Sequence, residues 1–236
     1  MKLYNFNQNL LEEINSAEKA YFLGFFCADG HLIKNRNGIQ FRLAIQDRDI
    51  LEKINKLFSS NLPIKEYLPS GNGKQNVVVL TMVGKIFKNN LSKLNLPYDK
   101  THYLEFPTYI QENLMSHFIR GYFDGDGWIT FFKRKNPQRL NKTEIMVGLL
   151  STKNFIEGLS KYLKNKQIKH HIGFRRVKTM DLWRLQISGS FEVLKFLDFI
   201  YKDKGDMFLE RKFNKFQKLI NEVIPMRKMG MVKNLP

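Results

Sequence analysis

Two stretches of the sequence, FLGFFCADG (22–30) and IRGYFDGDG (119–127), decide how this chain folds. Each is an apolar, aromatic run with glycine at its third position and Asp-Gly at its end. A second pair of similar segments follows them, IQDRDILEKINKLF (45–58) and LSTKNFIEGLSKYL (150–163). Similarity at a nearly fixed spacing indicates an internal duplication, so we expect two copies of one structural unit.

Each copy is predicted to be an α+β unit with a four-stranded antiparallel sheet, from its apolar periodicity and its turn residues. In the first copy we expect helices over 15–28, over 48–59 and after Gly84, and strands over 31–36, 39–46, 63–68 and 75–83. In the second we expect helices over 111–125, 153–164 and 190–201, and strands over 128–134, 143–150, 169–177 and 181–188. The expected domains are a first unit (1–97), a linker (98–110), a second unit (111–205), and a C-terminal helix (206–222) with a basic tail that together span 206–236. The linker overlaps the stretch LNLPYDKTHYLEFP (94–107), whose two prolines mark it as a connector.

Small residues mark one face of each motif helix. Gly24 and Ala28 are four residues apart, as are Gly121 and Gly125, and residues at i and i+4 share a helix face. Such faces let two backbones approach closely. We therefore expect the two motif helices to pack against each other and to relate the two halves by a pseudo-twofold axis.

Asp29 and Asp126 then fall at helix C-termini, with Gly30 and Gly127 as left-handed C-caps. A carboxylate is unfavourable there, because the helix dipole is negative at this end and a second carboxylate is near. A cation should offset both charges, and Mg²⁺ with oxygen ligands is the natural candidate. One Asp-Gly is usually just a turn, but two at matching ends of matching helices favour a site. A calcium loop does not fit, since Trp128 stands where a third ligand should be.

The composition indicates a globular nucleic-acid binder. The 236 residues are 43% hydrophobic and 26% charged, and 39 Lys and Arg against 22 Asp and Glu give a net charge of +17. Residues 132–184 alone hold 14 basic and 3 acidic side chains, and basic strands suit a groove of DNA. The single cysteine, Cys27, excludes a disulfide scaffold and a cysteine-based zinc site. Because no apolar stretch reaches the roughly 18 residues of a membrane span, we expect a soluble protein located wherever its target DNA is.

The paired motifs resemble those of LAGLIDADG homing endonucleases, and the duplication resembles the single-chain members with two motifs. The resemblance covers nearly the whole chain and implies two pseudo-symmetric αββαββα units, packed through the motif helices, whose sheets saddle the DNA. It implies a monomer that cuts both strands of a long asymmetric double-stranded target, by Mg²⁺-dependent hydrolysis of phosphodiester bonds that leaves 3′ overhangs. Because the sequence starts at Met1 and has no cysteine besides Cys27, we expect a free-standing reading frame without intein splicing ends.

The resemblance also implies site residues. The catalytic, metal-binding carboxylates are those of Asp29 and Asp126, and the backbone carbonyls of Ala28 and Gly125 are further metal ligands. Cys27 stands where the family often has an acidic residue, but that position is not a metal ligand, so Cys27 does not argue against activity.

Three more residues are candidates for assisting catalysis. Gln46, at the end of the second expected strand, corresponds to a glutamine that often positions water, although an ordinary helix-entry residue explains it equally well. Lys178 and Arg184 are candidates for a basic assistant, with a phosphate contact as the plainer interpretation.

Strand and hairpin residues are candidates for DNA contact, because Arg and Lys pair with guanine and Gln with adenine, while phosphate is the safer partner for any one of them. In the first unit the candidates are Lys34, Arg36, Gln40, Arg42, Lys65 and Lys74. In the second unit they are Lys133, Arg134, Lys135, Arg139, Lys142, His170, Arg175 and Arg176.

Two alternatives to an endonuclease stay open. One is an RNA maturase, a splicing cofactor for a cognate intron RNA on the same scaffold, which would bind RNA even without Asp29 or Asp126. The other is a DNA-binding regulator that does not cleave. The presence of both carboxylates argues against the regulator.

Overall fold

The computed structural model describes residues 4–33, 36–69, 75–94, 96, 100–133, 143–177 and 180–228. By their contacts they form two compact units. Unit 1 comprises Met1–Leu104, Thr108–Gly125 and Lys204–Arg211. Unit 2 comprises Glu105–Pro107, Asp126–Asp203 and Lys212–Pro236.

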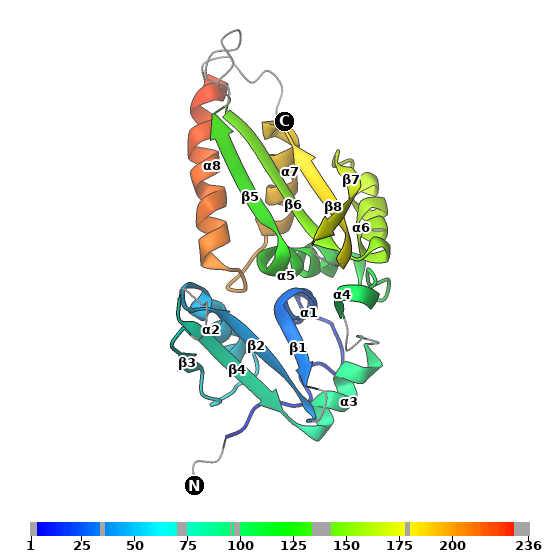
Figure 1. Ribbon diagram of the computed structural model, residues 1–236, viewed down its shortest axis with the longest axis vertical. Helices are drawn as coiled ribbons and strands as arrows, with labels where there is room; N and C mark the ends of the chain where they lie inside the picture. The colour runs from blue at the N-terminus through cyan, green and yellow to red at the C-terminus, as the bar shows by residue number, and fades with distance from the viewer. Residues whose placement is uncertain are drawn as a thin grey trace. The chain divides into compact units, whose positions relative to one another are not determined.

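Unit 1 contains the first four-stranded antiparallel sheet. Its strands are β1 (Gly30–Ile33), β2 (Gly38–Ala44), β3 (Lys65–Tyr67) and β4 (Val77–Val83), in the order β1-β2-β4-β3 (Figure 1). Alternation along β2 buries Ile39, Phe41 and Leu43 on one face, because successive strand side chains point to opposite sides. The other face, which carries Arg42, is called the open face below.

Helices cover the buried face of this sheet. The helices of unit 1 are α1 (Ala17–Asp29), α2 (Arg48–Leu57), α3 (Lys85–Lys93), α4 (Lys100–Tyr103) and α5 (Met115–Asp126, in unit 1 as far as Gly125). The core is rich in aromatic rings, and Phe22 meets both Phe41 and Phe58 edge-on, with ring centroids 6.0 and 4.8 Å apart. Such offset geometry is the favoured one for aromatic pairs.

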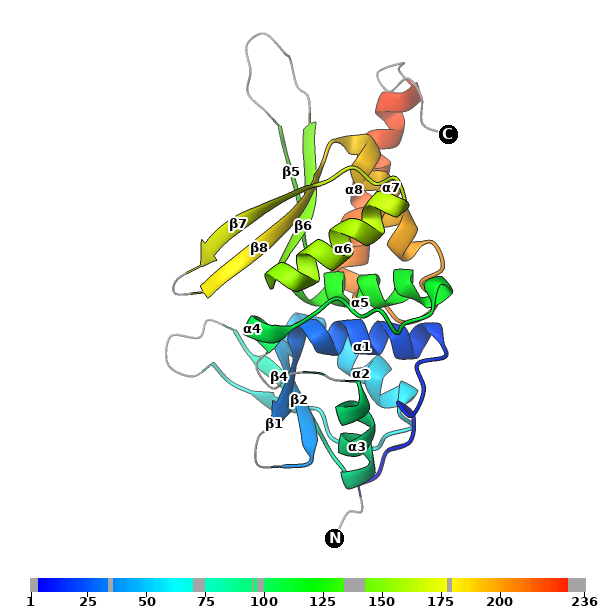
Figure 2. The same ribbon diagram turned by 90° about the vertical axis from the view of Figure 1, so that its right-hand side faces the viewer.

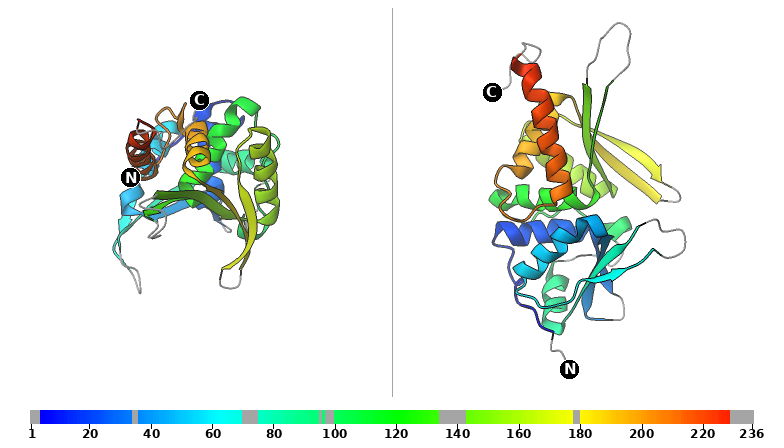
Figure 3. Two further views of the ribbon diagram at one scale, coloured as in Figure 1. Left: turned by 90° about the horizontal axis from the view of Figure 1, so that it is seen from above. Right: turned by 90° about the vertical axis from the view of Figure 1, so that its left-hand side faces the viewer.

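Unit 2 repeats the plan. Its strands β5 (Trp128–Lys133), β6 (Thr143–Ser151), β7 (His171–Val177) and β8 (Met180–Ser188) form an antiparallel sheet in the order β5-β6-β8-β7. Helices α6 (Lys153–Asn165), α7 (Ser190–Tyr201) and α8 (Glu210–Lys228, in unit 2 from Lys212) lie on one side of it (Figures 2 and 3). The face with buried Val147, Leu149 and Leu185 meets the helices, and the opposite one is the open face of this sheet.

The predicted α+β fold and its two four-stranded antiparallel sheets are confirmed. Most elements start and end within three residues of their expected limits. The final helix begins at Glu210 and not at 206, because residues 204–209 belong by their contacts to unit 1. The expected linker also contains the short helix α4. Among the residues described, no helix is long and apolar enough to cross a membrane.

The segment Lys204–Arg211, called the return segment below, brings the chain back into unit 1 after α7. Met207 and Leu209 are buried in the core of unit 1. The Arg120 side chain of α5, itself 1% exposed, donates hydrogen bonds to the carbonyls of Met207 (3.0 Å) and Lys204 (3.1 Å). Carbonyl groups of an irregular segment need such donors once they are buried. Unit 1 is therefore completed by a part of the chain more than a hundred residues away from its sheet.

Candidate functional site

The two motif helices touch through their glycines, as the sequence predicted. A Cβ atom on Gly24 would lie 2.0 Å from the carbonyl oxygen of Phe118, and one on Gly121 would lie 2.0 Å from that of Tyr21. No real side-chain carbon tolerates such a distance, so only glycine permits this approach. Figure 2 shows α1 and α5 side by side.

The ends of the two helices also meet. A Cβ on Gly125 would lie 2.3 Å from the Cβ of Ala28 and 3.1 Å from Oδ2 of Asp29. Asp29 is the last residue of α1, and Asp126, which directly follows Gly125, is the last of α5. Both aspartates are exposed, although nearly every residue before them in the motifs is buried. The packing that buries the motif helices thus stops at the carboxylates.

Neither motif ends in the expected left-handed glycine cap. Gly30 is extended, with φ −76° and ψ 150°, and its N–H bonds to the Phe26 carbonyl. Within the described chain, the glycines with positive φ are Gly189 and Gly205, so the expectation was wrong for Gly127 as well. Gly30 is needed for space, because a Cβ there would lie 2.1 Å from the Phe26 ring. The glycine turns the helix directly into β1.

A cation does lie at the negative end of α1, and it is a side chain that the sequence analysis did not select. Lys100 of α4 donates hydrogen bonds to the carbonyls of Phe26 and of Cys27, the latter at 3.1 Å, and its Nζ is 4.6 Å from the centre of the Phe26 ring. A lysine stabilises unsatisfied carbonyls at a helix C-terminus. Its position in the proline-containing connector, some seventy residues downstream of the motif, gave no signal of this contact.

Gln46 lies in unit 1, in a short 3₁₀ turn, Ile45–Asp47, that follows β2, and its side chain is exposed. The neighbouring Asp47 accepts a bidentate pair of hydrogen bonds from Arg211 of the return segment, Nε to Oδ1 at 2.8 Å and a terminal nitrogen to Oδ2 at 2.9 Å. This hydrogen bonding raises the pKa of Arg211, with smaller contributions from Asp47, Asp124 and Asp29 through their charges. A guanidinium thus holds the turn that carries Gln46, and it lies close enough to Asp29 to sense its charge.

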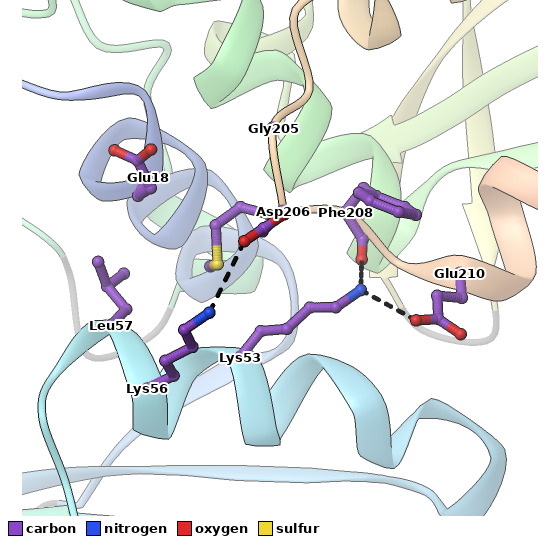
Figure 4. A pocket seen from close by; sticks show the side chains of 9 residues that line it. Glu18, Lys53, Lys56, Leu57, Gly205, Asp206, Phe208 and Glu210 are labelled. Atoms are coloured by element: carbon purple, nitrogen blue, oxygen red, sulfur yellow. Dashed lines mark hydrogen bonds and ion pairs between the residues drawn. The ribbon is translucent and has the colours of Figure 1, made fainter.

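A cavity of about 710 Å³ opens between α2 and the return segment (Figure 4). It contains none of the predicted site residues. Lys53 donates to the carbonyl of Phe208 at 2.9 Å and pairs with Glu210 at 3.3 Å, while Lys56 pairs with Asp206 at 3.8 Å. The two lysines of its lining therefore pair with acidic side chains of the return segment.

On the first sheet, strand register places three predicted DNA-contact residues on the open face. Gln40 and Arg42 lie on β2, and Lys65 lies on β3 opposite Val79, which also faces Arg42. The Gln40 amide donates to Thr81 Oγ1 at 3.1 Å. Arg36 is exposed in the turn before β2.

On the second sheet, the predictions divide between the two faces. Arg184 and Arg175 belong to the open face by register, whereas Arg176 is directed to the other face and pairs there with Asp181, at 2.9 and 3.3 Å. Because successive residues of a strand point to opposite faces, Arg176 and Arg175 do not share the open face, and the DNA contact of Arg176 stays a prediction.

His170 also has partners within the protein. Its Nε2 lies 2.7 Å from Ser160 Oγ of α6, and its Nδ1 lies 2.8 Å from the Ile168 carbonyl. Burial lowers its pKa, and the ring bridges helix and loop, while its predicted DNA contact stays a prediction. Lys133 is the last residue of β5. The remaining candidates lie outside the described residues: Lys34, Lys74, Arg134, Lys135, Arg139, Lys142 and Lys178.

The donors at the helix ends suit a hard cation. Two carboxylates and backbone carbonyls are oxygen ligands, which Mg²⁺ prefers. In the described part of the chain, no group of three or more His, Cys, Asp or Glu side chains could hold a metal ion by itself. A metal at the end of either motif would therefore need backbone, water or phosphate oxygens to complete its shell.

Comparison with known proteins agrees with the repeat. A family model described as "LAGLIDADG-like domain" matches residues 16–94 and 113–201. The meganuclease I-AabMI, solved bound to uncleaved DNA, has a TM-score of 0.63 at 15% identity and aligns over 91% of this chain and 92% of that one. I-SmaMI, solved bound to uncleaveable DNA, has a TM-score of 0.60 at 11% identity, over 92% of each chain. At such identities the likeness is one of fold.

Two curated proteins of Methanocaldococcus jannaschii are also similar. Glutamine–fructose-6-phosphate aminotransferase is 26% identical over 212 residues, which are 86% of this chain but 18% of that protein. A probable translation initiation factor IF-2 is 27% identical over 158 residues, 64% of this chain and 12% of that protein. The chain thus spans only a small part of either relative, and the two relatives differ in function.

Proposed function

The chain belongs to the LAGLIDADG-like domain family, and on that premise we propose that it is a site-specific endonuclease of double-stranded DNA. It hydrolyses one phosphodiester bond in each strand of a long asymmetric target and leaves 3′ overhangs. The observation that carries the proposal is the close contact of α1 and α5 through Gly24, Gly121 and Gly125, which ends at the exposed carboxylates of the two motifs.

Asp29 and Asp126, with the carbonyls of Ala28 and Gly125, would hold Mg²⁺ together with phosphate oxygens of the DNA. When bound, the metal lowers the pKa of a water molecule and stabilises the leaving oxygen. The surrounding side chains orient the attacking water and compensate the partial negative charge at the end of α1. The Gln46 amide orients the attacking water, the Arg211–Asp47 pair holds the turn that carries Gln46, and Lys100 compensates the carbonyls at the end of α1.

The open faces of the two sheets supply the DNA interface. Arg42 and Lys65 in unit 1, and Arg175 and Arg184 in unit 2, bring positive charge to these faces. The two open faces carry different residues, so the two halves of the target differ in sequence. The protein acts as a monomer, because one chain already carries both motifs. The net charge of +17 supports fast, salt-dependent association with DNA.

A random library of double-stranded DNA tests the activity and identifies the target in one experiment. The library is incubated with the protein and Mg²⁺, and new ends are captured and sequenced. We expect ends with 3′ overhangs within one recurring sequence, none in EDTA, and none with Asp29→Asn or Asp126→Asn. Glu52→Gln, which changes an exposed carboxylate on α2 away from the motif ends, is the matched control and keeps cleavage.

The outcomes separate the alternatives. Enrichment of one bound sequence without any new ends would identify a DNA-binding regulator instead. RNA binding that survives Asp29→Asn, with no cleavage of DNA, would identify a maturase. Cleavage that persists in both aspartate variants would refute the proposed site.

A further inference from the structure

The open face of the second sheet holds an arginine whose surroundings differ from those of every other arginine described on this sheet. Arg184 lies on β8, an inner strand, between β6 and β7. Its direct neighbours across the strands are Leu150 on β6 and Gly173 on β7. The side chain is half-buried, and within the described chain no carboxylate or other hydrogen-bonding group contacts it. Arg176, by contrast, has its bidentate partner Asp181.

The glycine beside Arg184 has no structural explanation. Gly173 does not have a positive φ, and a Cβ built on it would meet nothing within 4 Å. Gly148, on the same open face, is different, because a Cβ there would lie 2.0 Å from the Trp128 ring. Glycine weakens a strand and often marks a place where a ligand or another backbone approaches closely. Gly173 thus leaves open space beside Arg184 that a side chain would otherwise occupy, and this space is called the notch below.

We propose that Arg184, with the notch at Gly173 beside it, reads a guanine in the major groove of the target half bound by unit 2. The inference rests on the proposed function, since it requires that the open face meets DNA. A half-buried guanidinium without a partner retains its five N–H donors in a planar fork. The fork matches the O6 and N7 acceptors of guanine, which is the commonest specific arginine contact with DNA.

The position on an inner strand favours a base over a phosphate. The major groove is about 12 Å wide and presents the base edges between its sugar-phosphate walls, so we expect the inner strands of a sheet in the groove to lie nearer the bases than its edge strands. Arg175 is the natural comparison, because it lies on the same face but on the edge strand β7 and is exposed. We expect Arg175 to contact phosphate, which positions the protein without selecting sequence. Under this proposal Arg184 contacts a base, and it is no longer a candidate for the basic assistant in catalysis.

The test compares the sequences that variants select. Wild type, Arg184→Ala, Arg184→Lys, Gly173→Ala and Arg176→Ala select bound DNA from a random library with Ca²⁺ in place of Mg²⁺. We expect one guanine position of the wild-type motif to lose its preference in Arg184→Ala, with discrimination falling roughly 10- to 100-fold. Arg184→Lys should retain most of the affinity but discriminate less, since a lysine cannot form the bidentate pair. Arg176→Ala is the matched control and should select the wild-type motif.

A modified base makes the test independent of the mutations. Replacing that guanine by 7-deazaguanine removes the N7 acceptor and should weaken wild type roughly 10-fold but leave Arg184→Ala unchanged. Gly173→Ala should weaken binding of the selected target without changing Tm, because the added methyl group fills the notch and contacts no protein atom.

Three results would decide against the proposal, and they are distinguishable. If Arg184→Ala selects the same motif as wild type, Arg184 does not read a base. If its affinity falls equally for all sequences and the salt dependence decreases by about one phosphate contact, Arg184 binds the backbone. If wild type selects no motif at all, the proposed function itself fails.

Discussion

The two motif helices, α1 and α5, share the residues that form their contact but bury different side chains. Both carry the glycines that let their backbones touch and the aspartate that ends them. At two aligned positions, however, α1 has Leu23 and Cys27 where α5 has Arg120 and Asp124. All four side chains are less than 5% exposed, so the difference lies inside the protein.

The polar pair of α5 has a specific task. Arg120 and Asp124 together bind the return segment, Arg120 through two carbonyls and Asp124 by accepting the N–H of Leu209 at 2.8 Å. Asp124 also accepts a hydrogen bond from the hydroxyl of Tyr21 on α1, at 2.8 Å. At the corresponding end of α1, a lysine from α4 binds backbone carbonyls instead. The duplication therefore keeps in both copies what the contact of the two helices requires, and it varies the positions that meet each connecting segment.

Giving α5 the residue of α1 should break this arrangement most severely. Asp124→Cys leaves the Tyr21 hydroxyl and the Leu209 N–H without their acceptor in a buried site, and we expect a loss of about 3–5 kcal/mol in the free energy of unfolding. Urea denaturation followed by circular dichroism measures it. Cys27→Ala on α1 is the control, with an expected loss of about 1 kcal/mol. Equal losses in the two variants would contradict the asymmetry.

The glycine contacts should be symmetric between the helices. Gly24→Ala and Gly121→Ala each place a methyl group 2.0 Å from a backbone carbonyl oxygen of the other helix, so the backbones must separate, at a cost of about 3 kcal/mol each. Thermal unfolding would show the loss as a lower Tm. Gly173→Ala, where nothing lies within 4 Å, is the matched control and should stay within about 0.5 kcal/mol of wild type. A motif variant as stable as this control would show that the helices are not held so closely.

Tyr21→Phe isolates one bond of the polar network. It removes the hydroxyl that donates a hydrogen bond to Asp124, while the Leu209 N–H still donates to the carboxylate. We therefore expect a loss of about 1–1.5 kcal/mol in the free energy of unfolding. In combination with Asp124→Cys the two losses should not add, because both variants remove the same hydrogen bond. Additive losses in the double-mutant cycle would indicate that the two side chains act independently.

The smallest effect concerns α1 and appears only at alkaline pH. Burial raises the pKa of the Cys27 thiol to about 12, which the charge of Lys100 only partly opposes. The unfolded thiol ionises near pH 8.5, whereas the folded one stays neutral. Stability is therefore fully present below that pH and falls as the pH rises toward 12, with a slope approaching about 1.4 kcal/mol per pH unit. The difference in stability between wild type and Cys27→Ala, measured from pH 7 to 10, should show this slope, and a constant difference would mean that the thiol is not buried.

Much of the architecture could be predicted from the sequence. The repeat of glycine and aspartate spacing predicted two motif helices in contact, and periodicity located eight strands in two sheets, because these features depend on residues close together in the chain. The glycine caps were predicted wrongly, since Gly30 is required by the nearby Phe26 ring and not by its own backbone angles. The sequence also did not indicate that Arg176 pairs with Asp181 or that His170 contacts Ser160. Charge alone does not tell which face of a strand a side chain occupies or whether it already has a partner.

The sequence by itself determined the duplication, the contact of the motif helices and the two terminal aspartates, because each follows from local spacing and from the absence of a Cβ. Only the tertiary structure decided which residues surround them. Lys100 and Arg211 reach the first motif and its neighbouring turn from distant segments, and Gly173 leaves space beside Arg184 across a strand pair. The physical reason is that partners far apart in the chain are chosen by packing and hydrogen bonding in the folded state. No short-range pattern in the sequence records that choice.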